Sequence, residues 1–130
     1  MKKIILLGVF GILLTQNLCF SACPSYKEFK YKNIDYQTKA MDMMNKPNVE
    51  NPMALLNDQQ AYYAAILPGC IEYFNSTPAP DCNRLSVLTT GYVMADDDKQ
   101  KLYRPHMDYL LNRLTNVCKF QVEASKMMIK

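Results

Sequence analysis

The chain has 130 residues, which suits one domain and leaves no room for a separate cofactor module. Hydrophobic residues make up 49% and charged residues 21%, which excludes a disordered tail and a highly charged nucleic-acid-binding arm. Only four glycines are present, two of them in the first eleven residues, which are too few for phosphate-binding loops or many tight hairpins.

The first segment has the layout of a secretory signal peptide. Two lysines precede an apolar run over residues 4–14, and small residues follow up to position 22. Eleven apolar residues rise only about 16 Å as a helix, roughly half the hydrocarbon thickness, which disfavours a membrane anchor. We therefore expect residues 1–21 to be cleaved, and residues 22–130 to form a single exported domain with no transmembrane segment.

A second cleavage pattern would tether the protein through Cys23. Residues 20–23 resemble a bacterial lipoprotein box with Phe in place of the usual Leu, and cleavage would then remove residues 1–22. Cysteine parity favours the soluble form, because four cysteines then remain, an even number that suits two disulfides in an oxidising compartment. The short lysine start is typical of bacteria, so the periplasm or the medium is the expected destination.

Helical spacing recurs along the mature chain, and no stretch shows a convincing strand alternation. The first helix is expected over residues 26–45, ending before Pro47. The second begins at Asn51–Pro52, where an N-cap residue precedes proline at the first helical position. Pro68–Gly69 is expected to kink or break this helix, which then continues for another turn or two.

Two further helices are expected in the second half. Asp81 is the expected cap of the third, whose apolar positions recur to Tyr92. Residues 96–98 are three aspartates that suit the start of the last helix, which is expected to reach about Met127 with a kink or restart at Pro105. The sequence therefore predicts an all-α, compact bundle of about four helices.

Two disulfides are expected to staple this bundle, because its apolar residues include many Met and Tyr and few Ile and Val. The cysteines Cys23, Cys70, Cys82 and Cys118 allow three pairings. Loop closure favours Cys70 with Cys82 across the proline-rich loop, and Cys23 with Cys118. Cys118 also lies on the apolar stripe of the last helix, which predicts an inward-facing half-cystine. The stripe consists of Met107, Leu110, Leu114, Val117, Cys118 and Val122.

Catalysis and metal binding have little support. Zinc ligands usually come in close pairs, whereas the four cysteines are separated by 46, 11 and 35 residues and no His-x-x-x-His occurs. The only imidazole, His106, is expected to be solvated. Glu72, flanked by apolar residues, would suit a small cell-wall hydrolase if burial raised its pKa, but no second acid is placed opposite it. We expect a non-enzymatic protein without metal or cofactor.

Basic residues interleaved with aromatic ones indicate a binding surface for a protein or for anionic, phosphoinositide-like lipid headgroups. Nucleic acid is not expected, because the net charge falls from +3 to +1 once the two leader lysines are removed. The candidate surface consists of two groups: Lys99, Lys101, Arg104 and His106, and then Tyr26, Lys27, Lys30, Tyr31 and Lys32.

The expected function is thus that of an exported binding module. Tyrosine and arginine are enriched at binding hot spots, and the chain has nine tyrosines. A secreted factor that engages a host or other target, as a virulence factor would, is the preferred hypothesis. The alternatives are a periplasmic immunity or inhibitor protein that plugs an enzyme's cleft, and the hydrolase. The sequence does not specify an oligomeric state.

Overall fold

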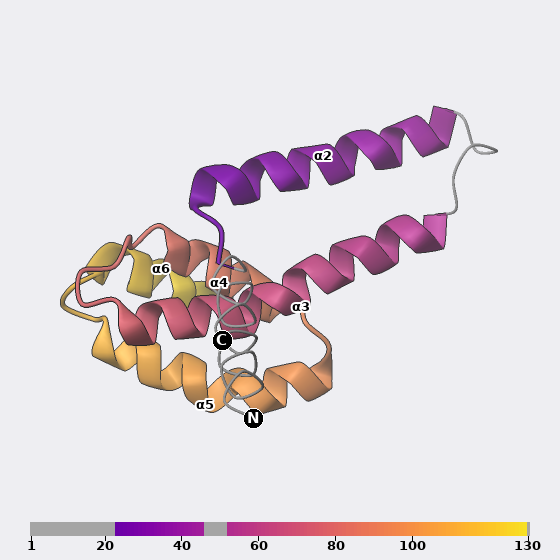
Figure 1. Cartoon of the computed structure of the whole chain (residues 1–130). Helices are drawn as coiled ribbons and strands as arrows, with labels where there is room; N and C mark the ends of the chain where they lie inside the picture. Colours follow the sequence, from indigo (N-terminus) through magenta and orange to yellow (C-terminus); the bar gives the residue numbers. More distant parts are fainter. Residues whose placement is uncertain (1–22, 46–51, 130) are drawn as a thin grey trace, which may run out of the picture.

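The computed structural model describes residues 23–45 and 52–129, and it is helical (Figure 1). The expected signal peptide, the residues before Cys23 in the lipoprotein box, and Asn51 lie outside the described residues. No strand occurs in the part described. The all-α prediction is confirmed, with five helices in place of about four: α2 (Tyr26–Asn45), α3 (Pro52–Ser76), α4 (Arg84–Val93), α5 (Asp97–Arg113) and α6 (Lys119–Ile129).

Side-chain caps explain where two of the helices begin. Before α2, the Ser25 hydroxyl accepts from the Glu28 backbone N–H (3.2 Å) and the Ser25 N–H donates to the Glu28 carboxylate (3.1 Å), a reciprocal capping box. Before α5, the Asp96 carboxylate accepts from the Lys99 backbone N–H (2.9 Å), as the three aspartates predicted. These hydrogen bonds also hold the pKa values of Glu28 and Asp96 below their ordinary range.

Neither internal proline ends its helix. Helix α3 runs through Pro68 and α5 runs through Pro105, which excludes a break or a restart at these positions and leaves the other expectation, a kink within a continuous helix. Both prolines are exposed, and the carbonyl that each leaves without a donor can therefore bond to water. The interruption comes instead at residues 114–118, where the Cys118 N–H donates to the Leu114 carbonyl (2.8 Å) and both side chains are buried.

The second half of α3 forms the body of the molecule together with α4, α5 and α6 (Figure 1). Helix α4 contacts each of the other described helices, and its Gly91 packs against Ile66 of α3. A Cβ there would lie 3.0 Å from Ile66 Cγ2, which is tighter than an ordinary contact, so the packing leaves little room for a side chain at this position. The fully buried core side chains include Leu67, Phe74, Leu85, Leu88, Met107, Leu110, Leu114 and Val122.

Helix α2 and the first half of α3 project away from the body as an antiparallel pair (Figure 1), called here the arm (residues 26–45 and 52–65). Aromatic rings join its two helices. Phe29 and Tyr36 of α2 pack against Tyr62 and Tyr63 of α3, with ring centroids 6.1–6.2 Å apart between the helices. The expected compact bundle thus describes the body but not the arm.

The disulfides join Cys23 to Cys70 and Cys82 to Cys118, so the expected pairing is wrong. Helix α3 continues to Ser76, which holds Cys70 away from the loop and beside the start of α2. Cys82 precedes α4 and lies 3.6 Å (Sγ) from the carbonyl oxygen of Val117, next to Cys118. The inward orientation of Cys118 is confirmed, because it is buried.

Candidate functional site

A pocket of about 210 Å³ opens between the start of α2, the start of α4 and α6. Its apolar lining includes Tyr26, Phe120 and Met128, whose exposed fractions are 46%, 80% and 47%. Its polar lining is provided by Asn83, Ser86, Gln121 and Ser125. This Tyr26–Phe120 pocket combines exposed rings with a few polar groups, a combination typical of sites that bind another molecule.

Both disulfides involve cysteines that lie within three residues of the pocket lining in the sequence. Tyr26 follows Cys23 by three residues, and Phe120 follows Cys118 by two. Asn83 is adjacent to Cys82. The covalent bonds therefore restrict the backbone on the α2, α4 and α6 sides of the pocket.

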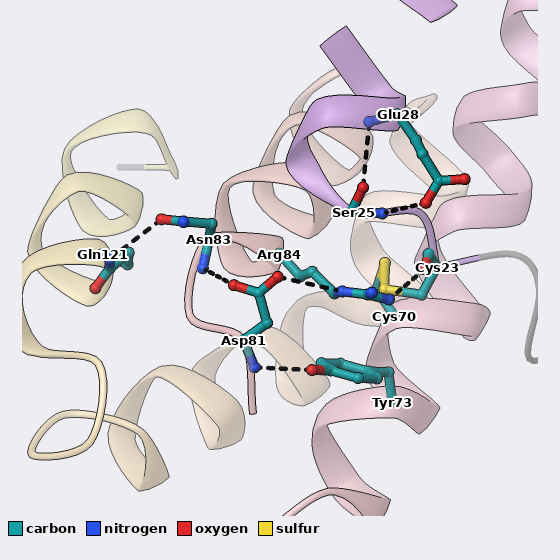
Figure 2. A network of polar contacts seen from close by, with 9 residues as sticks. All are labelled: Cys23, Ser25, Glu28, Cys70, Tyr73, Asp81, Asn83, Arg84 and Gln121. Atoms are coloured by element: carbon teal, nitrogen blue, oxygen red, sulfur yellow. Dashed lines mark hydrogen bonds and ion pairs between the residues drawn. A yellow bond between two sulfur atoms is a disulfide. The ribbon is translucent and has the colours of Figure 1, made fainter. Parts of the chain in front are cut away.

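A polar network fastens the α2 side of the pocket to the body (Figure 2). Arg84 Nη1 donates to the Cys23 carbonyl (2.8 Å), and Arg84 Nε lies 3.5 Å from the Asp81 carboxylate. The same guanidinium lies over the Tyr73 ring, 4.8 Å from its centroid, and the Tyr73 hydroxyl accepts from the Asp81 N–H (2.7 Å). Arg84 thus links the residues that lead into α2 to both α3 and α4.

Two contacts hold α6 against α4 at the pocket. The Thr89 hydroxyl donates to the Ser125 hydroxyl (2.8 Å), and both side chains are buried. Nearer the surface, Gln121 Nε2 lies 3.5 Å from Asn83 Oδ1, as Figure 2 shows. Because Ser125, Gln121 and Asn83 all line the pocket, these bonds fix its polar side before any ligand arrives.

The first predicted basic group lies on α5 and is not gathered into one patch. Lys99 Nζ pairs with Asp96 (3.2 Å) and Arg104 Nε pairs with Asp108 (3.0 Å), so carboxylates neutralise two of its cations. Lys101 is two residues from Lys99, and side chains at this spacing point to nearly opposite sides of a helix. The group is therefore divided between two opposite sides of α5, with Lys99 and His106 on one side and Lys101 and Arg104 on the other.

The second predicted group, on α2, is divided by the helix. Lys32 Nζ lies 5.1 Å from the Tyr36 ring centroid and 5.6 Å from that of Tyr62, so it is turned toward the aromatic rings of the arm. Tyr26 lines the pocket, and Lys30 lies one turn further along the same face. The remaining members, Lys27 and Tyr31, are exposed.

Sequence reasoning missed Phe120 and Met128. Helix α6 has apolar residues on two faces. Val122 is buried on one face. Phe120, Ala124 and Met128 follow at steps of four on another face and are exposed. A second apolar stripe of this kind was the available signal, but it is indistinguishable by spacing from a core stripe. Glu72 is exposed, so the burial on which the hydrolase hypothesis depends is not found.

No group of metal-ligating side chains occurs within the described ranges, and no helix there is long and apolar enough to cross a bilayer. The two disulfides are compatible with an extracellular or periplasmic location. Comparisons with protein-family models, with curated proteins and with solved structures give no significant match for this chain.

Proposed function

We propose that the chain is an exported, non-enzymatic binding module that presents the Tyr26–Phe120 pocket to a protein partner. The observation that carries the proposal is the pairing of large exposed rings with covalent bracing of the same walls. Exposed aromatic side chains contribute much of the binding free energy at interfaces, and rigid positioning reduces the entropy lost on association.

The chemistry of the pocket favours a partner that inserts an apolar side chain. Tyr26, Phe120 and Met128 would contact that side chain, while Asn83 and Gln121 would bond to the neighbouring backbone. Lys30, one turn from Tyr26, would favour an acidic group at the edge of the contact.

A protein is favoured over an anionic membrane because the basic residues are dispersed. Lys99 and Arg104 are paired with carboxylates, and Lys32 is directed at tyrosine rings. Electrostatic attachment to a bilayer requires several lysines or arginines on one surface. We infer further that the protein acts outside the producing cell, which predicts its accumulation in the culture medium; retention in the periplasm would favour the inhibitor hypothesis.

Site-specific photo-cross-linking tests the proposal. A photoreactive phenylalanine analogue replaces Phe120 in one variant and Tyr109, an exposed aromatic residue of α5, in a matched control. In the presence of the target organism's proteins, the variant at position 120 should form a discrete adduct identified by mass spectrometry. That adduct should disappear when Tyr26→Ala and Met128→Asp are added.

The control position should give no adduct of the same mass. Equal labelling from positions 120 and 109 would show general surface adhesion and would contradict the proposal, as would the absence of any adduct at 120. Flotation with phosphoinositide vesicles that depends on Phe120 would assign the pocket to a membrane and would also overturn it.

A further inference from the structure

The arm carries a helix face whose apolar residues have the spacing of a core-facing stripe. The outer part of this face remains exposed in the described chain. Along α3, the residues Leu56, Tyr63, Leu67, Cys70 and Phe74 follow at steps of seven, four, three and four, which places them on one helix face. All from Tyr63 onward are buried, whereas Leu56 remains 46% exposed. The face that packs inside the body thus continues beyond the body.

Helix α2 adds apolar side chains to the same side of the arm. Asn33, Met41 and Met44 follow at steps of eight and three and share a face of α2. The Tyr63 hydroxyl donates to Asn33 Oδ1 (2.6 Å), which puts this face beside the α3 face that carries Leu56. Ile34 lies seven residues before Met41 and therefore close to it around the helix. We call Ile34, Met41, Met44 and Leu56 the apolar side of the arm; their exposed fractions are 46%, 64%, 82% and 46%.

Charge favours self-association of this side over attachment to an anionic surface. Along the described arm, the four lysines at positions 27, 30, 32 and 39 are balanced by Glu28, Asp35, Asp42 and Asp58, giving a net charge of zero. A neutral arm is not repelled by its own copy, and it lacks the excess of cations that anionic lipids attract.

The exposed area is sufficient for a stable dimer. The four side chains expose roughly 450 Å² per chain, so two copies would bury about 900 Å² of apolar surface. Since homodimer interfaces are roughly 65% apolar, the whole contact would be about 1,400 Å², within the size of stable interfaces. A layer of two helices is complemented in shape by another such layer, which gives a four-helix bundle.

We propose that the apolar side of the arm binds the same side of a second copy of this chain, in a contact with two-fold symmetry. Such symmetry requires a self-complementary surface, which a neutral apolar face provides. The contact does not use the Tyr26–Phe120 pocket, so the dimer would present two pockets.

The test is the oligomeric state of the mature protein with both disulfides intact, measured by sedimentation equilibrium and light scattering. The wild type should be a dimer. Leu56→Glu introduces a charge twice into a symmetric interface and should raise the dissociation constant by at least about 100-fold. Ala54→Glu places the same charge two residues away, on the opposite and exposed side of α3, and should leave the dimer intact.

Circular dichroism is the control that both glutamate variants are folded. Met44→Glu, at a position that is 82% exposed, is a second change expected to disrupt the dimer. The proposal is overturned by a wild type that stays monomeric at about 1 mM, a concentration at which even weak specific contacts form. It is equally overturned by a dimer that neither Leu56→Glu nor Met44→Glu weakens. Vesicle binding by a monomeric wild type that Leu56→Glu abolishes would assign the side to a membrane instead. Phe120→Glu should not change the oligomeric state, which separates this result from the pocket experiment.

Discussion

Removing either disulfide should destabilise the protein by a similar amount while loosening different walls of the pocket. The changes are paired alanine substitutions, Cys23→Ala with Cys70→Ala in one variant and Cys82→Ala with Cys118→Ala in the other. Alanine is chosen over serine because Cys70 and Cys118 are buried, where a new hydroxyl would need a hydrogen-bond partner.

The size of the effect follows from the lengths of chain that the disulfides close. The sequence separations are 47 residues for Cys23–Cys70 and 36 for Cys82–Cys118. The loop-closure entropy restored to the unfolded chain corresponds to about 4 kcal/mol in each case. Domains of this size have about 5–15 kcal/mol in total, so each variant should still fold, with a midpoint lowered by roughly 15–20 °C, whereas loss of both should abolish folding.

Urea denaturation measures the loss of stability, and hydrogen exchange localises it. Without Cys23–Cys70, faster exchange is expected at the start of α2, which carries Tyr26. Without Cys82–Cys118, it is expected in α6, which carries Phe120. A loss below about 1 kcal/mol in both variants, or the same exchange pattern in both, would refute this account of the bracing. Peptide mapping that joined Cys70 to Cys82 would refute the pairing itself.

Four other perturbations have defined outcomes. Ser125→Ala leaves the buried Thr89 hydroxyl without its 2.8 Å partner and should cost about 1–2 kcal/mol in urea denaturation, partly recovered by adding Thr89→Val. Gly91→Ala should lower the melting temperature, because a steric cost of about 1–3 kcal/mol against Ile66 of α3 exceeds the roughly 1 kcal/mol gained in helix propensity. A rise in the melting temperature would contradict the close packing of α4 against α3. Burial raises the pKa of Tyr62 from 10.0 to about 12, so the folded state holds this proton more tightly than the unfolded state. The stability that this group contributes should be present below pH 10 and lost as the pH rises toward 12, and Tyr62→Phe should make the fall in stability over this range less steep. Hydrogen bonds lower the pKa of Asp96 below 3.8, so the stability that this carboxylate contributes should be present above pH 3.8 and lost on further acidification. Asp96→Ala should lower the melting temperature at pH 7 and remove the loss of stability that protonation of Asp96 causes in acid.

Local chemistry predicted α2 and the start of α5 well, because a helix start and an apolar face are encoded within a few residues. The expected cap of the third helix at Asp81 is wrong, because α4 begins at Arg84 with Asn83 at its N-cap, while the Asp81 carboxylate accepts from the Asn83 N–H. The expected first helix has the observed bounds, and the aspartate cap of α5 forms as predicted. Along the last predicted helix, Met107, Leu110 and Leu114 are buried as their spacing indicated. Val117 is 58% exposed, because the interruption between α5 and α6 turns it outward.

The disulfide pairing could not be predicted from spacing. Loop closure favours the nearest cysteines in a flexible chain, but the residues after Cys70 are helical as far as Ser76. Six helical residues span about 9 Å, which carries the chain away from Cys70 before the loop begins. The cysteine that does reach it, Cys23, lies before a helix that a sequence alone does not orient.

The candidate site was predicted only in part, for a related reason. Tyr26 was identified from the mixture of basic and aromatic residues, but its neighbours in the pocket come from α4 and α6. Phe120 follows the interruption at residues 114–118, which the sequence pattern represented as continuous helix. Val122 is buried as the predicted stripe indicated, but a small error in helical phase moves other side chains between core and surface, so the exposure of Phe120 could not be read from spacing.

The two open surfaces have different physical origins. Around the pocket, Tyr26 and Phe120 stay exposed on elements that disulfides and Arg84 already hold, so their exposure does not depend on a partner for order. The two helices of the arm are held to each other by the ring cluster and by hydrogen bonds such as that from Tyr63 to Asn33. Leu56 lies on the α3 face whose residues from Tyr63 onward are buried, but it is itself 46% exposed. Because a partly covered helix pair gains much of its stability from packing, ordering of the arm should depend on association more strongly than ordering of the pocket. Hydrogen exchange in the outer half of the arm should therefore slow as protein concentration rises, while exchange in α6 should not change.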